Sequence, residues 1–281
     1  MKFIKNVIFD IKYGTLKNVK LFLMPIIIAV LIFVDIFNNS KMVSEIAEFS
    51  SKISLGDFIF YTYGGIEEYI PSPDNPFVFP VVWMVIYLSI SFILLNYPVK
   101  DMHSVGSQIL LRSNSRVNWW LSKCMWNVLS TIIYHGIILF IFILLCSIKK
   151  IPLINEVNLD LQWVLLKFRS DVIMNNLVII PIKIFVNILL LSIFINLLQM
   201  TMSLFIKPVF SFLAVAIIML SSSYLLSPVM VGNYGMFLRY NWIYEGGVSF
   251  NTGVIVLVCL IFTTVVIGLI RFKKYDILDK D

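Results

Sequence analysis

Charged residues are scarce in this chain of 281 residues. They make up 14% of it, whereas a typical soluble domain has about 25%. Hydrophobic residues account for 59%, and the mean hydropathy is +0.92. These values exclude an ordinary soluble domain and predict an all-α integral membrane protein. The net charge of +6 is then set by membrane topology, and we expect no nucleic-acid partner.

Catalytic motifs are also missing. The sequence has no GxxxxGKS/T phosphate loop, no HExxH and no GxSxG. Its two histidines, His103 and His135, are too few for a three-histidine zinc site. Glu67-Glu68 lacks the arginine of an EExxxR peptidase motif, because position 72 is serine. We therefore expect no enzymatic activity, metal or cofactor in this chain.

Cysteines are few, and they do not suggest a disulfide framework. Cys124, Cys146 and Cys259 all fall within or at the ends of long uncharged runs. They are most simply apolar packing residues. A clear signal-peptide cleavage site is also missing after the basic N-terminal stretch.

Long uncharged runs predict six membrane-spanning helices in a single domain over residues 1–281. The predicted spans are 21–37, 77–97, 124–148, 176–203, 209–226 and 253–270. Residues 2–20 repeat apolar side chains at helical spacing between lysines. That pattern is typical of an amphipathic helix in the membrane interface; a disordered basic tail is the alternative.

The segments between the predicted spans differ in length and charge. Residues 38–76 and 149–175 are long enough to contain helices, and we expect them to form an extracellular helical cap. The uncharged run from Pro208 to Leu238 exceeds the roughly 20 residues that one span needs. Its proline- and glycine-containing end therefore predicts an extracellular re-entrant segment within residues 227–252.

Basic residues predict that both termini are cytoplasmic. In that orientation 14 of the 22 lysines and arginines fall on the inner side, 7 fall on the outer side, and Lys183 lies within a span. Short cytoplasmic loops of multi-pass proteins carry such an excess. We therefore expect a multi-pass protein of a cell membrane, in contact with membrane lipids.

The segment 98–123 is the basic loop between the second and third predicted spans. It holds four basic residues against one acid, Asp101. Val105, Ile109 and Leu110 fall at helical spacing and predict a short helix with one apolar face. The pair Trp119-Trp120 is predicted to anchor this helix at the lipid headgroups. An ordinary cytosolic turn is the alternative.

Two patches carry a resemblance to a known family. The first comprises Asp101, Gly106, Gln108, Leu110, Arg112, Ser115, Arg116, Trp119, Trp120, Ser122 and Lys123; the second comprises Gly232-Asn233-Tyr234, Met236 and Arg239. With the helix count, they resemble permease subunits of type-2 ABC exporters, in the branch of small bacterial permeases with one six-helix unit per chain.

The resemblance implies a function and partners. In that family the first loop contains a coupling helix that docks on a separate ATPase, and two permeases pair. This chain would then be a permease in the bacterial cytoplasmic membrane. Its partners would be an ATPase subunit that binds ATP and Mg, and a second permease that is either identical or homologous. Some members export antimicrobial or amphipathic peptides or confer immunity to them, which suggests such a substrate by analogy.

Two groups of candidate site residues follow. The resemblance assigns ATPase coupling to Asp101, Val105, Gln108, Ile109, Arg112 and Arg116. Polar side chains within spans give candidates for a translocation path: Asn127, His135, Lys183 and Asn187. Hydrogen bonding between helices, or snorkelling in the case of Lys183, explains these four residues without a transport role.

A self-contained secondary transporter or channel, with no ATPase partner, is the alternative function. It calls for inverted repeats and broken, charged helices at mid-membrane, and the sequence does not display these convincingly. The sequence leaves open the identity of the substrate, the choice between homodimer and heterodimer, and the direction of transport.

Overall fold

The computed structural model describes residues 2–19, 22–46, 53–72, 76–102, 106, 110, 115–167, 179–243 and 246–275. Regular structure within these ranges is helical, which confirms the prediction of an all-α protein. The elements are α1 (Lys2–Asp10), η1 (Ile11–Thr15), η2 (Leu16–Asn18), α2 (Leu23–Ile46), α3 (Leu55–Gly64), α4 (Val81–Leu94), α5 (Tyr97–Met102), α7 (Arg116–Lys149), α8 (Leu159–Leu166), α9 (Ile184–Met202), α10 (Pro208–Tyr224), η4 (Val231–Gly235), η5 (Phe237–Arg239) and α11 (Phe250–Lys274).

Five helices among the described residues are long and apolar enough to cross a membrane. They are Leu23–Met42, Val81–Met102, Arg116–Lys149, Ile184–Met202 and Phe250–Lys274. The remaining predicted span, 209–226, is the fifth along the chain and corresponds to α10, which is apolar but has only 17 residues. At 1.5 Å per residue it is about 26 Å long, slightly less than the ~30 Å thickness of a hydrocarbon core.

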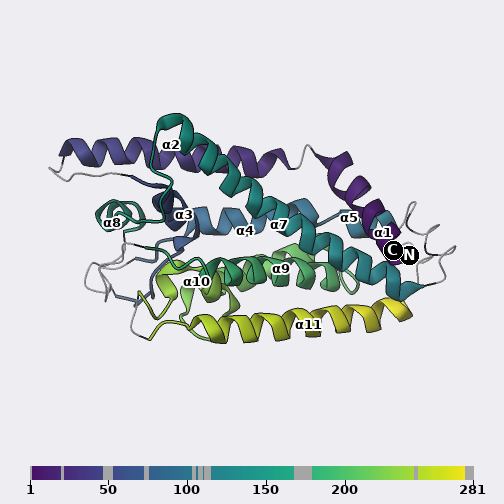
Figure 1. The fold of residues 1–281 in the computed structure, drawn as a ribbon. Coiled ribbons are helices and arrows are strands. Elements are labelled where there is room, and N and C mark those ends of the chain that lie inside the picture. The colour runs from purple at the N-terminus through teal and green to yellow at the C-terminus, as the bar shows by residue number, and fades with distance from the viewer. Residues whose placement is uncertain are drawn as a thin grey trace.

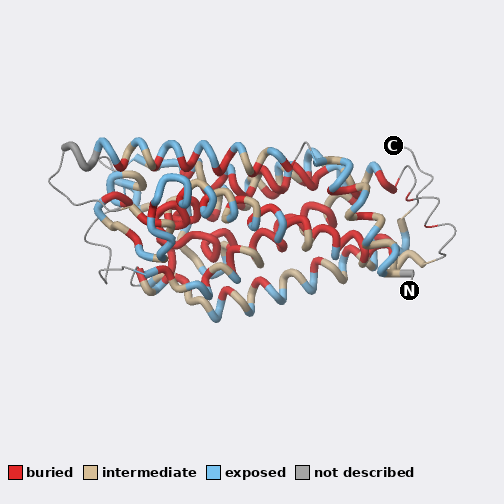
Figure 2. The backbone as a smooth tube through the Cα atoms, turned by 45° about the horizontal axis from the view of Figure 1, so that its top comes forward, coloured by how far each residue is buried: buried red, intermediate tan, exposed pale blue. Residues whose placement is uncertain are grey.

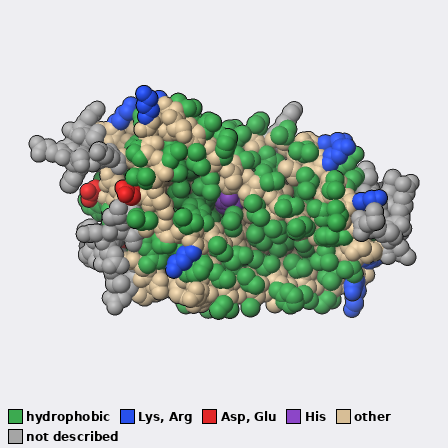
Figure 3. All heavy atoms as spheres, viewed as in Figure 1, with side chains coloured by type: hydrophobic (Ala, Val, Ile, Leu, Met, Phe, Trp, Pro, Cys, Tyr) green, Lys and Arg blue, Asp and Glu red, His purple; other side chains and the backbone are tan. Residues whose placement is uncertain are grey.

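The helices form an elongated bundle with two distinct ends (Figure 1). α1, α5 and the start of α7 lie at one end, together with the last turns of α11. α3 and α8 lie at the other end. Buried residues concentrate along the inner helices, and exposed ones along the outer faces (Figure 2). Figure 3 shows that hydrophobic side chains cover most of one long face, as expected of a surface in contact with lipid.

Three helices are longer than the spans that the sequence predicted: α2, α7 and α11, which runs from Phe250 to Lys274 rather than over 253–270. α2 continues to Ile46 rather than ending near residue 37, so Asp35 lies within the helix. Its carboxylate accepts a hydrogen bond from the hydroxyl of Tyr61 at 2.9 Å. α7 has 34 residues and begins at Arg116, where Ser115 caps it by accepting the backbone N–H of Asn118. It is therefore about 51 Å long and extends well beyond a hydrocarbon core.

The second predicted span is interrupted near its end. α4 ends at Leu94, and α5 begins at Tyr97 and continues through Pro98 to Met102. Proline has no N–H to donate to the carbonyl four residues earlier, and its ring crowds that carbonyl. The break therefore falls just before Pro98, and residues 98–102 of the predicted loop are helical.

The two long segments predicted to form a cap, 38–76 and 149–175, are joined at the α3–α8 end. Ser54 caps α3, and the Asp57 side chain accepts the Ser54 backbone N–H in return, which forms a capping box. Asp57 is fully buried and also accepts the N–H of Asn158 at 2.7 Å and the side-chain amide of Gln162 at 3.2 Å. One carboxylate thus links segments about 100 residues apart in the sequence.

Residues 231–239 fold back among the helices as η4 and η5, in the region predicted to be re-entrant. Arg239 is fully buried. Its guanidinium donates to the carbonyls of Ile66 and Ser223, each at 2.7 Å, and to the side-chain oxygen of Asn233 at 3.1 Å. Gly235 packs where any Cβ would collide with Leu191, so this segment approaches α9 closely.

Candidate functional site

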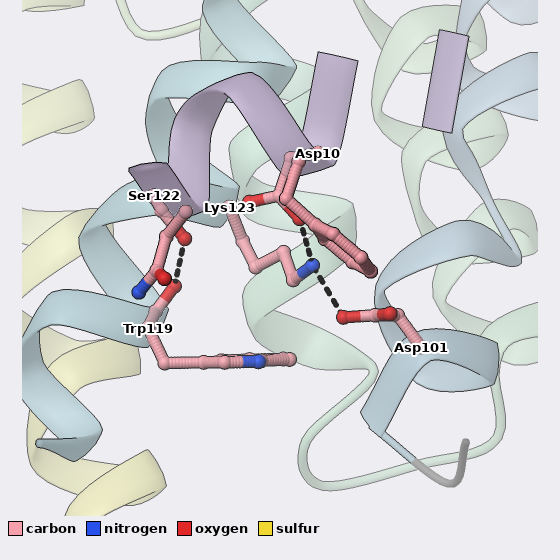
Figure 4. Close-up of a pocket in the computed structure, with 7 residues that line it drawn as sticks. Asp10, Asp101, Trp119, Ser122 and Lys123 are labelled. Atoms are coloured by element: carbon pink, nitrogen blue, oxygen red, sulfur yellow. Dashed lines mark hydrogen bonds and ion pairs between the residues drawn. The ribbon is translucent and has the colours of Figure 1, made fainter. Parts of the chain in front are cut away.

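A buried charge cluster joins three elements at the α1–α5 end of the bundle (Figure 4). Lys123 of α7 reaches between Asp10, the last residue of α1, and Asp101 of α5. Its ammonium forms an ion pair with Asp10 and another with Asp101 at 2.5 Å. The three side chains are 1%, 2% and 6% exposed, respectively. We call Asp10, Asp101 and Lys123 the charge cluster.

Aromatic groups enclose the lysine. Its Nζ atom lies 4.7 Å from the ring centre of Tyr97 and 4.9 Å from that of Trp119, within the range of cation–π attraction. The Tyr97 hydroxyl also donates to Oδ1 of Asp10 at 3.0 Å. These contacts hold the ammonium in one position, and all of them exclude water from it.

The charge cluster holds more acid than base. Two carboxylates share one ammonium, so full ionisation leaves one negative charge buried without a matching cation among these three residues. Burial raises the pKa of Asp10, although attraction to Lys123 opposes the rise. Asp10 Oδ2 has no hydrogen-bond partner among the described residues. Protonation of Asp10 therefore relieves the charge imbalance without breaking a hydrogen bond to Oδ2.

Sequence reasoning identified one member of the charge cluster and missed the other two as site residues. Asp101 was a coupling candidate, whereas Asp10 was not singled out, and Lys123 was a basic loop residue and a member of the resemblance patch with no role assigned. A signal was present, because Asp10 is the only acid in residues 1–34 and Asp101 the only one in residues 75–155. Single acids in otherwise basic inner segments are good candidates for specific ion pairs.

Arg116, another coupling candidate, is engaged within the chain. Its Nη1 atom donates to the backbone carbonyls of Phe272, Lys273 and Tyr275 at 3.1, 2.9 and 2.7 Å. These carbonyls lie at and just past the end of α11, where the last carbonyls of a helix lack partners four residues on; the carbonyl of Phe272 also accepts the backbone N–H of Tyr275. The first residue of α7 thus caps the last turn of α11. Val105, Gln108, Ile109 and Arg112 lie outside the described residues.

The tryptophan pair packs inside the bundle. Trp119 stacks on Phe272 with ring centres 4.6 Å apart. Trp120 is 1% exposed, donates its indole N–H to the carbonyl of Val265, and fills the space above Gly268. The prediction that this pair is an anchor in the lipid headgroups is therefore wrong, because α11 supplies its contacts.

Above the charge cluster, one face of α7 stays polar and buried. Lys123, Asn127, Thr131 and His135 recur every four residues, which places them on one side of the helix. Thr131 accepts the side-chain amide of Asn196 on α9 at 3.1 Å. That asparagine in turn accepts the hydroxyl of Ser91 on α4 at 2.7 Å. This stripe connects α7 to α4 and α9 through hydrogen bonds.

The upper part of the stripe borders a cavity. His135 Nδ1 is hydrogen-bonded to the hydroxyl of Tyr63 on α3 at 2.8 Å. Both residues line a cavity of about 510 Å³ between α3, α7 and α9. Of the four path candidates, only His135 lines it.

The other three path candidates have different surroundings. Asn127 is buried on the α7 stripe. The Asn187 amide donates to the Tyr240 hydroxyl at 3.0 Å and to the carbonyl of Phe250 at 3.1 Å, as expected of a structural cross-link. Lys183 is exposed just before α9, with its ammonium 5.6 Å from the ring centre of Phe250.

Comparison with known proteins identifies a family. The model of the family described as "Protein of unknown function (DUF2705)" matches residues 23–278. The chain therefore belongs to this family. No curated protein and no solved structure matches the chain at a significant level.

Proposed function

We propose that this member of the DUF2705 family is the membrane-spanning permease subunit of an ATP-driven ABC exporter, coupled to a separate ATPase subunit. The observation that carries the proposal is the charge cluster. Asp101 and Lys123 stand at the two ends of the loop 98–123, and Asp10 stands at the end of the helix before the first span. Motion of this loop would be transmitted directly to α1, α5 and α7.

The topology that accompanies this proposal has six spans, with α10 as the fifth in sequence. Both termini and the loop 98–123 face the cytoplasm, and the joined α3 and α8 segments face outward. Two features support it. The last turns of α11 lie at the same end of the bundle as α1 (Figure 1). The inner segments of that arrangement also carry the excess of basic residues.

The proposed partners follow from the same role. The ATPase binds ATP and Mg, and its closure moves the coupling loop. A second permease, identical or homologous, completes the path in the bacterial cytoplasmic membrane. By analogy, the proposed substrate is an amphipathic or antimicrobial peptide. The protein would either export such a peptide or confer immunity to it.

Affinity purification of the tagged chain from its host membrane tests this function. We expect a stoichiometric ATPase that carries a phosphate-loop motif. A charge reversal at Arg112 should reduce its recovery, whereas Lys150→Glu at the opposite end of α7 should not. Arg116 is a poor choice for this test because it caps α11, and its replacement would disturb the fold.

A self-contained transporter or channel is the second candidate function. The observation that favours it is the buried Tyr63–His135 pair in a membrane-facing cavity, since polar groups within spans often mark a substrate path. Purification of this chain without any ATPase, under conditions that preserve membrane complexes, would favour this alternative.

A further inference from the structure

One exposed arginine at the end of α11 is held in place by its neighbours. Arg271, in the last turn of α11, donates its Nε–H to the carbonyl of Leu204, between α9 and α10, at 3.3 Å. Its guanidinium carbon lies 5.1 Å from the ring centre of Phe205 and 5.8 Å from that of Tyr275. One hydrogen bond and cation–π attraction to two rings therefore fix the position of the guanidinium. We call Leu204, Phe205, Arg271 and Tyr275 the arginine site.

The outer edge of this guanidinium still has donors to offer. Arg271 is exposed, and its Nη1 and Nη2 atoms have no hydrogen-bond partner among the described residues. Arg116 differs, because three backbone carbonyls already occupy its Nη1 atom. Parallel N–H groups of a guanidinium match two oxygens of a phosphate or carboxylate. Because Arg271 is already fixed, it loses little side-chain entropy when it binds such an anion.

The arginine site lies at the depth expected for lipid headgroups. α11 begins at Phe250, so Arg271 lies about 32 Å from the start of the helix along its axis, close to the ~30 Å thickness of a hydrocarbon core. Ile267 lies one turn earlier on the same side of α11 and is 53% exposed, and Phe205 is 57% exposed. Exposed apolar side chains therefore border the guanidinium on the side of the span.

The elements that form the arginine site bring further cations and no acid. Lys274 lies one turn after Arg271 on the same side of α11, and Lys207 lies in the turn between α9 and α10; both are exposed. Residues 172–244 and 246–275 contain no Asp or Glu, so α9, α10 and α11 carry no carboxylate side chain. The surface that results is basic at its end and apolar toward the span. A molecule with an anionic head and an apolar body complements both parts.

We propose that the arginine site binds the phosphate of an anionic phospholipid, with an acyl chain of that lipid along Ile267 and Phe205. A free phosphate ion would gain nothing from these apolar side chains. A zwitterionic phospholipid adds a cationic group, which Lys207 and Lys274 repel. The inference does not depend on the exporter function, because it rests on the geometry around Arg271 and on the span that α11 forms. A bound phosphate would tie the turn between α9 and α10 to the end of α11.

Photolabelling of the purified protein in lipid vesicles tests the proposal. The vesicles consist of phosphatidylcholine with a trace of a probe lipid that carries a diazirine in one acyl chain. The probe is either phosphatidylglycerol or phosphatidylcholine with identical chains. We expect the phosphatidylglycerol probe to label the peptides of the α9–α10 turn and of the end of α11 about fivefold more than the phosphatidylcholine probe does, as expected for one basic residue that attracts an anionic lipid.

Variants separate a specific site from the general charge of this end. Arg271→Gln should abolish the preference for phosphatidylglycerol. Arg271→Lys should keep only part of it, because an ammonium does not offer parallel N–H groups to a phosphate. Lys273→Gln removes the same charge at an exposed position on a different side of α11, and should keep most of the preference. A melting curve of each variant in phosphatidylcholine alone checks that it is folded.

Four outcomes would overturn the proposal. Equal labelling by the two probes would mean that the arginine site does not select anionic lipid. Equal losses in Arg271→Gln and Lys273→Gln would indicate diffuse attraction to an anionic surface. Full preference in Arg271→Lys would show that no guanidinium is needed. Finally, three acids follow α11 in the sequence, Asp276, Asp279 and Asp281. A preference that appears only after all three are replaced by Asn would assign the arginine site to the chain's own C-terminal residues.

Discussion

Replacing both acids of the charge cluster should lower the free energy of unfolding by much more than the sum of the two single replacements. Asp10→Asn leaves Lys123 paired with Asp101, and Asp101→Asn leaves it paired with Asp10. Each single change keeps a one-to-one ion pair and removes the excess buried charge. We therefore expect each to change the free energy of unfolding by less than about 0.5 kcal/mol.

The double variant Asp10→Asn/Asp101→Asn leaves a lysine that is 1% exposed without either carboxylate. Removing the partners of a buried charge costs about 3–5 kcal/mol, so the coupling between the two sites should be roughly 2 kcal/mol or more. Lys123→Met should cost a similar amount, because it leaves two buried carboxylates. The triple variant with all three replacements should recover most of the stability.

Equilibrium unfolding in mixed micelles, followed by tryptophan fluorescence, measures these values. Trp119 lies beside the lysine and is a natural reporter.

Asp10 should also make the stability of wild type depend on pH. Because burial raises its pKa, the folded protein binds this proton more tightly than the unfolded chain, and stability falls as pH rises through the folded pKa. Wild type should therefore gain stability relative to Asp10→Asn on acidification. Additive single effects, or singles that each cost 3 kcal/mol, would refute the shared-lysine geometry.

Three further predictions concern other parts of the bundle. Burial raises the pKa of Asp57 from 3.8 to about 6. The free energy of unfolding of wild type should therefore rise by up to about 3 kcal/mol relative to Asp57→Asn as pH falls from above 6 to below 4. A pH-independent difference in melting temperature would contradict this. Gly136→Ala should stabilise the protein by about 0.5–1 kcal/mol, because its Cβ enters open space, whereas Gly268→Ala should destabilise it, because its Cβ collides with Trp120. Similar melting shifts for the two would argue against the packing described. Arg239→Ala should cost about 3 kcal/mol or more, because three carbonyl acceptors lose their donor, and Arg239→Lys should recover only part of that in a denaturation assay.

Hydropathy predicted the helical membrane bundle well, because the free energy of burying apolar side chains in lipid depends mainly on composition and length. Helix boundaries were less predictable. α7 begins at Arg116 because Ser115 caps it and because Trp119 and Trp120 pack against α11. Those contacts come from residues about 150 positions away, so no local pattern reveals them. The carbonyls that Arg116 binds are equally far away in the sequence, so its role in capping α11 could not be predicted either.

The site was predictable in part. Asn127 and His135 were candidates from their polarity within a span, and the structure buries both, with Thr131, on one face of α7. The charge cluster was harder to predict, because Asp10 and Lys123 are 113 positions apart and either residue reads as a solvated charge by itself. The cavity was not predictable either, since it forms only where α3, α7 and α9 meet.

Cross-linking at the loop tests the central claim most directly. A photoreactive amino acid replaces Gln108 in the loop 98–123, and a matched variant carries it in place of Asp160 in α8, at the other end of the bundle. After illumination of host cells, we expect a covalent adduct with a phosphate-loop ATPase from position 108 and none from position 160. No ATPase adduct from position 108, or equal adducts from both positions, would contradict a coupling role for this loop.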